Sequence, residues 1–322
     1  MTESVSHYNL LERLGEGGLG EVYRARDTKV GRTVALKVLP PGLLADEAQR
    51  AAVTSAARAA AALSHPNIAT LFDSGEHRGR WYLAYEFVAG TTLRNEMGGR
   101  AVNPRRALEL AVQIADALAD AHARDLVHGD LRPDTIMVTG KGSAKILEFG
   151  LSAWTRGGAA RAVAAASPDA LGSDPLRVAA YLSPEQALGG AIDARSDLFT
   201  LGVILYEMLT GRSPFAGATS GATVMNVIRN TPPRPSELNP GLHAELDGIV
   251  GRALAKDLDG RYQSAASFAA ELRSMAAMLD VRSGEAQADE LIPPDEPQGS
   301  GRLWLALLLI VALVAVWWYL QR

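Results

Sequence analysis

The feature that most restricts the fold is a change of pattern near residue 89. Before it, short runs alternate apolar and polar residues, which is typical of half-buried strands. After Gly90, apolar residues recur at helical spacing over longer stretches. Strands are expected at 8–14, 20–26, 33–39, 68–74 and 81–88, and helices at 46–63, 105–124, 196–209, 242–254 and 264–278. Strands followed by helices predict an α+β domain over residues 8–278.

Composition excludes several classes of function. The 322 residues are 48% hydrophobic, which supplies material for a large core. The chain has no cysteine, so disulfides, thiolate metal sites and cysteine nucleophiles are excluded. Its six histidines show no metal-ligand spacing. A net charge of −4 argues against a nucleic acid partner, because phosphate binding requires a basic face.

An uninterrupted apolar run of 18 residues, Leu303 to Leu320, stands apart from this domain. As a helix it would span roughly 27 Å, close to the thickness of a bilayer core. Aromatic residues lie near both ends of the run: Trp304, Trp317, Trp318 and Tyr319. A buried core helix is the alternative, but such helices rarely run this long without a polar face. We predict a single-pass membrane anchor at 303–320, joined to the domain by an acidic, flexible linker at 279–302.

A glycine-rich turn separates the first two predicted strands. The segment Gly15-Glu16-Gly17-Gly18-Leu19-Gly20-Glu21-Val22 fits G-x-G-x-x-G-x-V, and its glycines let the backbone approach phosphate oxygens. Dinucleotide-binding proteins share this glycine spacing, but there a helix follows, whereas here Val22 begins a strand pattern. The next strand carries Val34-Ala35-Leu36-Lys37. Alone, Lys37 would be an ordinary lysine on a strand surface.

Four later segments complete an ordered set. They are His128 to Thr135, Glu148-Phe149-Gly150, Ser183-Pro184-Glu185 and Asp193 to Asp197. In this order, the set resembles the bacterial serine/threonine protein kinases of the eukaryotic type, from Tyr8 to about Met278. The resemblance implies a bilobal fold with a small β-rich lobe at 8–88 and a larger helical lobe at 89–278. It also implies ATP as cofactor, with Mg²⁺ or Mn²⁺, and an ion pair between Arg261 and Glu185.

The same resemblance assigns site residues. It implies that Asp130 is the catalytic base and that Lys37 and Arg132 hold phosphates. Residues 86–88 would form the hinge that binds adenine, with Tyr85 as gatekeeper. The implied ATP-binding residues are Leu14, Gly15, Glu16, Gly17, Gly18, Leu19, Gly20, Val22, Ala35, Lys37, Glu86, Val88 and Met137. Each apolar member of this set could equally be plain core packing.

The sequence departs from the family at the positions that hold metal and phosphate. The glutamate that should pair with Lys37 is Ala56, and the arginine of the catalytic loop is Gly129. The two implied metal ligands are altered to Thr135 and Glu148. A glutamate is one methylene longer than the family's aspartate, and a misplacement of about 1 Å can reduce a rate on the order of a hundredfold. We predict that Lys37, without its helix partner, pairs with Glu148.

Three functions follow from these features. The leading hypothesis is a membrane-anchored pseudokinase or very weak kinase, in the cytoplasm where ATP is found, that presents a surface to an unknown protein partner. The second is an active serine/threonine kinase that uses Asp130 as base. The third is a structural membrane adaptor without a nucleotide pocket. The retained glycines argue against the third, because such a protein has no packing reason to keep them.

Overall fold

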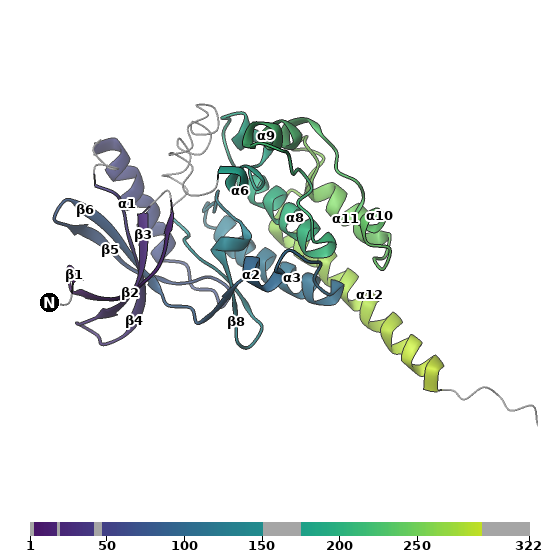
Figure 1. Cartoon of the computed structure of the whole chain (residues 1–322), viewed down its shortest axis with the longest axis horizontal. Coiled ribbons are helices and arrows are strands. Elements are labelled where there is room, and N and C mark those ends of the chain that lie inside the picture. The colour runs from purple at the N-terminus through teal and green to yellow at the C-terminus, as the bar shows by residue number, and fades with distance from the viewer. Residues whose placement is uncertain (1–2, 18–19, 42–46, 151–174, 292–322) are drawn as a thin grey trace, which may run out of the picture. The chain divides into compact units, whose positions relative to one another are not determined.

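The computed structural model describes residues 3–17, 20–41, 47–150 and 175–291. Its contacts divide the chain into two units, Met1–Ala276 and Ala277–Arg322. The first unit holds a sheet-rich lobe and a helical lobe, which Figure 1 draws from purple to green. The predicted two-lobed α+β fold is therefore confirmed.

Six antiparallel strands form the sheet of the first lobe in the order β1-β2-β3-β4-β6-β5. Their bounds are β1 Ser4–Val5, β2 Tyr8–Gly17, β3 Gly20–Asp27, β4 Thr33–Val38, β5 Leu71–His77 and β6 Arg80–Glu86. Alternation turns one face inward, so the cross-strand partners Ala25 and Val34 are both fully buried. Helix α1, Glu47–Ala61, lies against β5 (Figure 1). This packing brings α1 close to the end of the lobe that borders the cavity described below.

Helices build the second lobe around α8, Ala194–Thr210, which is buried on almost every side. Asp193 caps its first turn by accepting a hydrogen bond from the Arg195 N–H, and Gly211 ends it in the left-handed conformation. Helix α3, Pro104–His122, packs along α8. The other helices are α2 Leu93–Met97, α6 Pro175–Ala179, α7 Pro184–Ala187, α9 Ser220–Arg229, α10 Pro235–Leu238, α11 Glu245–Ala253 and α12 Ala265–Leu291.

A small three-stranded sheet fixes the segments that carry chemistry. It consists of β7 Gly90–Thr92, β8 Ile136–Thr139 and β9 Ala144–Ile146, in the order β7-β8-β9. Residues 128–135 lead into β8 through the 3₁₀ turn η1, Pro133–Thr135, and Glu148 follows β9. In the antiparallel pair, the start of β8 lies beside the end of β9. The catalytic loop, which leads into β8, therefore lies beside the segment with Glu148, which follows β9.

The structure corrects one predicted boundary. The helix predicted at 264–278 continues as α12 to Leu291. Residues 279–291 of the predicted linker are therefore helical, where alanines and glutamates favour helix and the first proline comes only at Pro293. The rest of the linker and the predicted span at 303–320 lie outside the described residues. Among the helices that the structure describes, none has the length and apolar character needed to cross a membrane.

Candidate active site

A cavity of about 630 Å³ lies between the two lobes. Its wall includes most of the predicted nucleotide-binding residues, namely Leu14, Gly15, Glu16, Gly20, Val22, Ala35, Lys37, Glu86, Val88 and Met137. Gly17 ends β2, while Gly18 and Leu19 lie outside the described residues. Apolar groups from both lobes thus face one another across a space of the size that small-molecule ligands occupy.

Two glycines of the turn, Gly15 and Gly20, differ in what surrounds them. Gly20 adopts φ 107°, and a Cβ added there would lie 2.1 Å from the Val38 carbonyl oxygen. Only glycine fits this close approach of β3 to β4. A Cβ added at Gly15 would meet nothing within 4 Å, so packing does not require a glycine there. The expectation that no glycine of the turn has a packing role is therefore wrong for Gly20.

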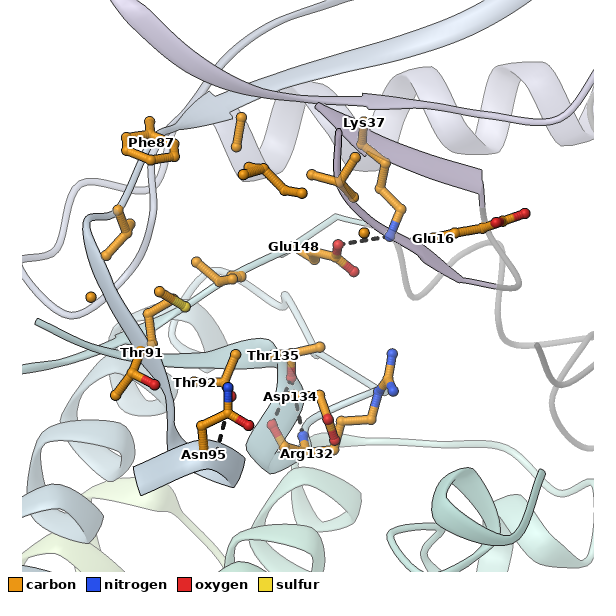
Figure 2. Close-up of a pocket in the computed structure, with 18 of the residues that line it drawn as sticks. Glu16, Lys37, Phe87, Thr91, Thr92, Asn95, Arg132, Asp134, Thr135 and Glu148 are labelled. Atoms are coloured by element: carbon orange, nitrogen blue, oxygen red, sulfur yellow. Dashed lines mark hydrogen bonds and ion pairs between the residues drawn. The ribbon is translucent and has the colours of Figure 1, made fainter. Parts of the chain in front are cut away.

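Lys37 and Glu148 form an ion pair at the back of the cavity. The Lys37 Nζ donates to Glu148 Oε1 at 2.7 Å, as Figure 2 shows. Burial alone would raise the pKa of Glu148, but the Lys37 ammonium, together with Arg132 and His128, lowers the pKa below its usual value. The predicted pairing is confirmed. The extra methylene of glutamate lets the carboxylate reach a lysine that has no partner on α1.

Helix α1 approaches the Glu148 segment through small residues. A Cβ added at Gly150 would lie 2.8 Å from the Ala60 Cβ and 3.2 Å from the Ala56 carbonyl oxygen. Gly150 also has φ 90°, where a side chain would be strained. The backbone of α1 therefore packs directly against the segment that carries Glu148. Because position 56 is an alanine, α1 offers no carboxylate to Lys37 at this point.

The Thr135 hydroxyl is used to shape the catalytic loop. It accepts a hydrogen bond from the Arg132 N–H at 3.1 Å and lies 3.0 Å from the Arg132 carbonyl oxygen (Figure 2). The Asp130 carbonyl oxygen lies 3.2 Å away, and the hydroxyl donates to one of these two carbonyls. Its side chain is buried, with the residue 3% exposed. The hydroxyl predicted to face a metal is thus occupied by protein groups.

Asp130, the predicted base, lies beside the cavity and not on its wall. Its Oδ1 is 3.4 Å from Arg132 Nε, and the two side chains are each 27% exposed. Burial alone would lower the pKa of Arg132, but Asp130 and then Glu148 raise it. Arg132 therefore lies in the field of two carboxylates, one on the catalytic loop and one after β9.

The residues present do not fit a divalent metal. Every carboxylate that the described residues contribute to the cavity wall is paired with a cation. The pairs are Glu16–Arg13, Glu86–Lys145 (2.6 Å), Asp134–Arg94 (3.1 Å) and Glu148–Lys37 (2.7 Å). The described part of the chain holds no group of three or more His, Cys, Asp or Glu side chains suited to a metal. The predicted metal ligands Glu148 and Thr135 both contact protein groups instead.

Tyr85 closes the space behind the cavity. Its hydroxyl donates to the Phe149 carbonyl oxygen at 3.1 Å, and its ring is buried. Burial raises the pKa of Tyr85 well above its usual value, so the phenol keeps its proton and remains a donor. The Phe149 ring packs edge-on against His128, with ring centroids 4.8 Å apart. The segment that carries Glu148 is therefore held from both sides.

A second group of polar side chains holds residues 128–130 in place. We call this group, Asp197, His122 and Gln186, the catalytic-loop brace. Asp197 of α8 accepts hydrogen bonds from the His128 and Gly129 N–H groups, each at 2.8 Å, and lies 2.8 Å from His122 Nε2. Gln186 Nε2 donates to the Gly129 carbonyl oxygen at 2.7 Å. Although burial alone would raise the pKa of Asp197, hydrogen bonding with His122 and the loop lowers it.

The predicted pair between Arg261 and Glu185 is also present. Two N–H groups of Arg261 donate to the two carboxylate oxygens of Glu185, both at 2.9 Å. The Arg261 side chain is fully buried, and Ser196 Oγ donates to Glu185 Oε1 at 2.6 Å. This two-pronged geometry is the strongest form of an arginine–carboxylate contact. It joins α7 to the loop that precedes α12.

Sequence inspection missed several residues of the cavity wall, notably Asn95, Asp134, Arg177 and Val178. Asn95 lies on α2, and Arg177 and Val178 lie on α6, so their sequence neighbourhood gives no sign of the cavity. A signal existed for Asp134 alone, because it lies between the predicted residues Arg132 and Thr135. The tertiary packing of α2 and α6 brings the others to the site.

Comparison with known proteins identifies the family. The model of the protein kinase domain matches residues 8–271. A probable serine/threonine-protein kinase of Streptomyces coelicolor is 40% identical over 264 residues, which cover 80% of this chain and 38% of that protein. Serine/threonine-protein kinase PknB of Mycobacterium tuberculosis is 37% identical over 297 residues, covering 90% of this chain and 44% of PknB.

Solved structures give the same result. The PknI kinase domain of Mycobacterium tuberculosis aligns with a TM-score of 0.68 at 27% identity, over 86% of this chain and 98% of that domain. The chain spans less than half the length of the curated relatives named above. The match over residues 8–271, together with the bilobal fold, shows that the chain belongs to the bacterial serine/threonine protein kinase family.

Proposed function

We propose that this chain is a membrane-anchored, nucleotide-binding member of its family, with weak or absent phosphoryl transfer, that presents a surface to protein partners. The Lys37–Glu148 pair carries the proposal. In a working kinase the equivalent lysine holds phosphates and the equivalent acid holds a metal ion. Here the two groups neutralise each other at 2.7 Å, so neither is set for its task.

The catalytic loop supports the same conclusion. Phosphoryl transfer depends on positioning and charge neutralisation, both of which tolerate little displacement. The Thr135 hydroxyl is hydrogen-bonded to the loop backbone. Position 129 is a glycine, so the loop lacks the arginine that would bind a phosphorylated residue of this chain. The apolar wall that would hold adenine is intact, with Val22, Ala35 and Met137 lining the cavity. Nucleotide binding is therefore expected to survive the loss of transfer.

An active serine/threonine kinase is the second candidate. One observation favours it: Asp130 is partly exposed beside Arg132 and could accept a proton from a substrate hydroxyl. In this alternative the family's use of ATP and a divalent metal would be retained despite Glu148. Ligand binding would then have to separate Glu148 from Lys37.

Autophosphorylation distinguishes the two candidates. The purified full chain in mild detergent is incubated with labelled ATP and Mg²⁺ or Mn²⁺, beside an Asp130→Asn variant. We expect no label above that of the variant, while a thermal shift still reports nucleotide binding. Label that enters the wild type and vanishes in Asp130→Asn would contradict weak or absent transfer and establish the active kinase. The double variant Glu148→Asp/Thr135→Asn provides a positive comparison, because it restores the family's metal ligands.

Anchoring rests on the sequence of residues 303–320, whose apolar length matches a bilayer core. The kinase-like domain would then face the cytoplasm, where ATP is found. Expressed in bacteria, the full chain should float with membranes and resist alkaline extraction, whereas a variant ending at residue 302 should not. Equal extraction of the two proteins would remove the anchor from the proposal.

A further inference from the structure

A second cavity, of about 540 Å³, lies within the helical lobe and shares no wall residue with the nucleotide cavity. We call it the helical-lobe cavity. Its wall comes from α8, from α10 and α11, and from the segment that joins α9 to α10 (Figure 1). Much of this wall is apolar or aromatic: Tyr206, Pro232, Pro233, Pro235, Val250 and Leu254. A cavity of this size and character suits a small organic ligand with an apolar body.

One face of α11 leaves this space open. Gly248 and Gly251 lie three residues apart on the helix, and both line the cavity. Ala244 and Ala255 continue the same face beyond the two ends of the helix. A Cβ added at either glycine would meet nothing within 4 Å. A large side chain at one of these positions would therefore occupy space that is now open, without a clash with the protein.

A buried hydroxyl without a partner lies on the wall formed by α8. Tyr206 is 1% exposed and lines the cavity. Burial raises the pKa of Tyr206, so the phenol keeps its proton and remains a donor. Within the part of the chain that the structure describes, no group accepts a hydrogen bond from this hydroxyl. Buried tyrosine hydroxyls usually have a partner, so an acceptor in the cavity would satisfy this donor.

Lys256, shortly after α11, brings a positive charge to the same cavity. Its Nζ donates to the Val227 carbonyl oxygen in the last turn of α9 at 2.6 Å and lies 3.6 Å from the centre of the Phe215 ring. Burial and then the charge of Arg261 lower the pKa of Lys256 to about 8. No carboxylate of the described residues forms an ion pair with it. The half-buried ammonium is therefore held in place while its charge is not neutralised.

The other charged side chains around Lys256 have partners of their own. Arg234 and Asp247 belong to the wall of the cavity, and the others lie around the loop that follows Lys256. The contacts are Arg234–Glu237 (4.0 Å), Arg261–Glu185 (2.9 Å), Arg195–Asp193 (2.8 Å), Arg195–Asp259 (3.5 Å), Ser236 N–H to Asp247 (3.0 Å) and Gly260 N–H to Asp257 (3.2 Å). Of the two cations on the wall, Lys256 is thus the one without an acidic partner in the described chain.

We propose that the helical-lobe cavity binds an apolar carboxylate, of which a fatty acid is the simplest example, with Lys256 as its charge partner and Tyr206 as a second hydrogen-bond donor. One ammonium without a carboxylate matches a single negative charge, whereas a phosphate would bury a further charge without a partner. The prolines and the open face of α11 then surround the apolar body. This site goes beyond the proposed function and does not depend on nucleotide binding.

Calorimetric titration of octanoate into the purified full chain in mild detergent tests the proposal. Octanol serves as the neutral ligand of equal length. The variants are Lys256→Met, Tyr206→Phe and Gly251→Leu, and Lys141→Met is the matched control. Lys141 is an exposed lysine in the turn between β8 and β9 and does not line the cavity, so its loss changes net charge equally. Octanoate partitions into detergent alike in every sample, so differences between the proteins report on the cavity.

Each variant has its own expected result. Lys256→Met weakens octanoate binding by about tenfold or more, and Tyr206→Phe by about threefold, the sizes of a charged and a neutral hydrogen bond. Gly251→Leu abolishes binding because the leucine fills the space, while Lys141→Met changes nothing. Octanol binds the wild type more weakly than octanoate and does not distinguish the wild type from Lys256→Met. Octanoate affinity begins to fall as pH rises through about 8, since the Lys256 ammonium loses its proton there.

A fold control accompanies these titrations. Lys256→Met removes a contact with the end of α9 and can lower the melting temperature by itself. Gly251→Leu alters no charge and replaces a helical glycine with a better helix former, so its melting temperature should not fall below that of the wild type. Loss of octanoate binding in Gly251→Leu is then an effect on the cavity and not on folding.

Other outcomes overturn the proposal. If octanoate does not bind the wild type, the cavity is not a carboxylate site. If Gly251→Leu binds octanoate as tightly as the wild type, the ligand lies elsewhere on the protein or in the detergent. If Lys256→Met keeps the wild-type affinity and octanol binds as well as octanoate, Lys256 is not the charge partner. Unchanged binding in Tyr206→Phe would remove the second donor.

Discussion

The catalytic-loop brace and the nucleotide cavity each contain a buried carboxylate, and the two carboxylates bind different kinds of partner. Asp197 accepts hydrogen bonds from two backbone N–H groups, whose positions are fixed by the loop itself. Glu148 pairs with the end of a lysine side chain, which can move. Both acids have pKa values below the usual range despite burial.

The difference shows which part of the molecule keeps the family's pattern and which part has changed. The brace keeps the acid on α8, and the separate pair between Glu185 and Arg261 is also kept, so the helical lobe retains the family's contacts. In the cavity, charges that serve metal and phosphate in the family instead satisfy each other. Backbone-held contacts maintain the frame, whereas a pair between two side chains can open for a ligand.

The largest expected effect is on the brace. Replacing Asp197 with Ala removes the acceptor for two buried N–H groups, and we expect a loss of about 3–5 kcal/mol in the free energy of unfolding. Urea denaturation followed by circular dichroism measures it. A loss below about 1 kcal/mol would mean that water replaces the carboxylate and that the brace is no more rigid than the cavity.

The cavity pair should contribute less. The change Lys37→Met leaves Glu148 without its ammonium, and we expect about 2–3 kcal/mol of destabilisation together with loss of ATP binding. The double variant Lys37→Met/Glu148→Gln serves as control, because removing both charges should recover most of the stability. If the double variant is no more stable than Lys37→Met, the two residues do not act as a pair.

The Lys37–Glu148 pair should also make the stability of the protein depend on pH in the acidic range. Because folding lowers the pKa of Glu148, the unfolded chain binds more protons once pH falls below the usual glutamate pKa. The pair's contribution therefore begins to decrease there and is lost as pH falls through the lower pKa of the folded state. Above the usual glutamate pKa the contribution is complete. The stability difference between the wild type and Glu148→Gln, measured by denaturation from neutral to acidic pH, should therefore shrink towards acid. A difference that is constant over this range would contradict the lowered pKa.

Tyr85 tests how firmly the Glu148 segment is held. The substitution Tyr85→Phe removes one buried hydrogen bond to Phe149 and keeps the ring, so a loss of about 1 kcal/mol is expected. Hydrogen exchange at residues 148–150 should rise in the variant, since the carbonyl oxygen loses its donor. Unchanged exchange there would show that the other contacts of the segment, the Lys37–Glu148 pair and the His128–Phe149 packing, hold it without the Tyr85 hydroxyl.

The smallest effect is expected far from both regions. Arg105 and Glu109 form an exposed i,i+4 pair on α3 with a distance of 3.5 Å. Arg105→Ala should change the free energy of unfolding by no more than about 0.5 kcal/mol, because solvent and salt screen such pairs. A larger change would show that charge on α3 supports the brace, since His122 at the end of α3 contacts Asp197.

Much of the fold could be read from the sequence alone: five strands and five helices, in their order along the chain, and most of the residues that line the cavity. The small sheet β7-β8-β9 and the helices α2, α6, α7, α9 and α10 were not predicted. Alternating and helical patterns predict the strands and helices because they depend only on neighbouring residues. The pairing of Lys37 with Glu148 also follows from the sequence, since Ala56 removes the usual partner and glutamate extends the reach of the acid. The pair between Arg261 and Glu185 follows from the order of the family's motifs along the chain.

The contacts of the other polar side chains follow from how the elements pack in three dimensions. Thr135 offers a hydroxyl in any conformation, and the geometry of residues 130–135 turned it to the loop backbone. Arg177 lies on α6 and reaches the cavity wall because α6 packs against α9. Contacts between residues distant in sequence depend on how elements pack together, and a linear pattern does not record that packing.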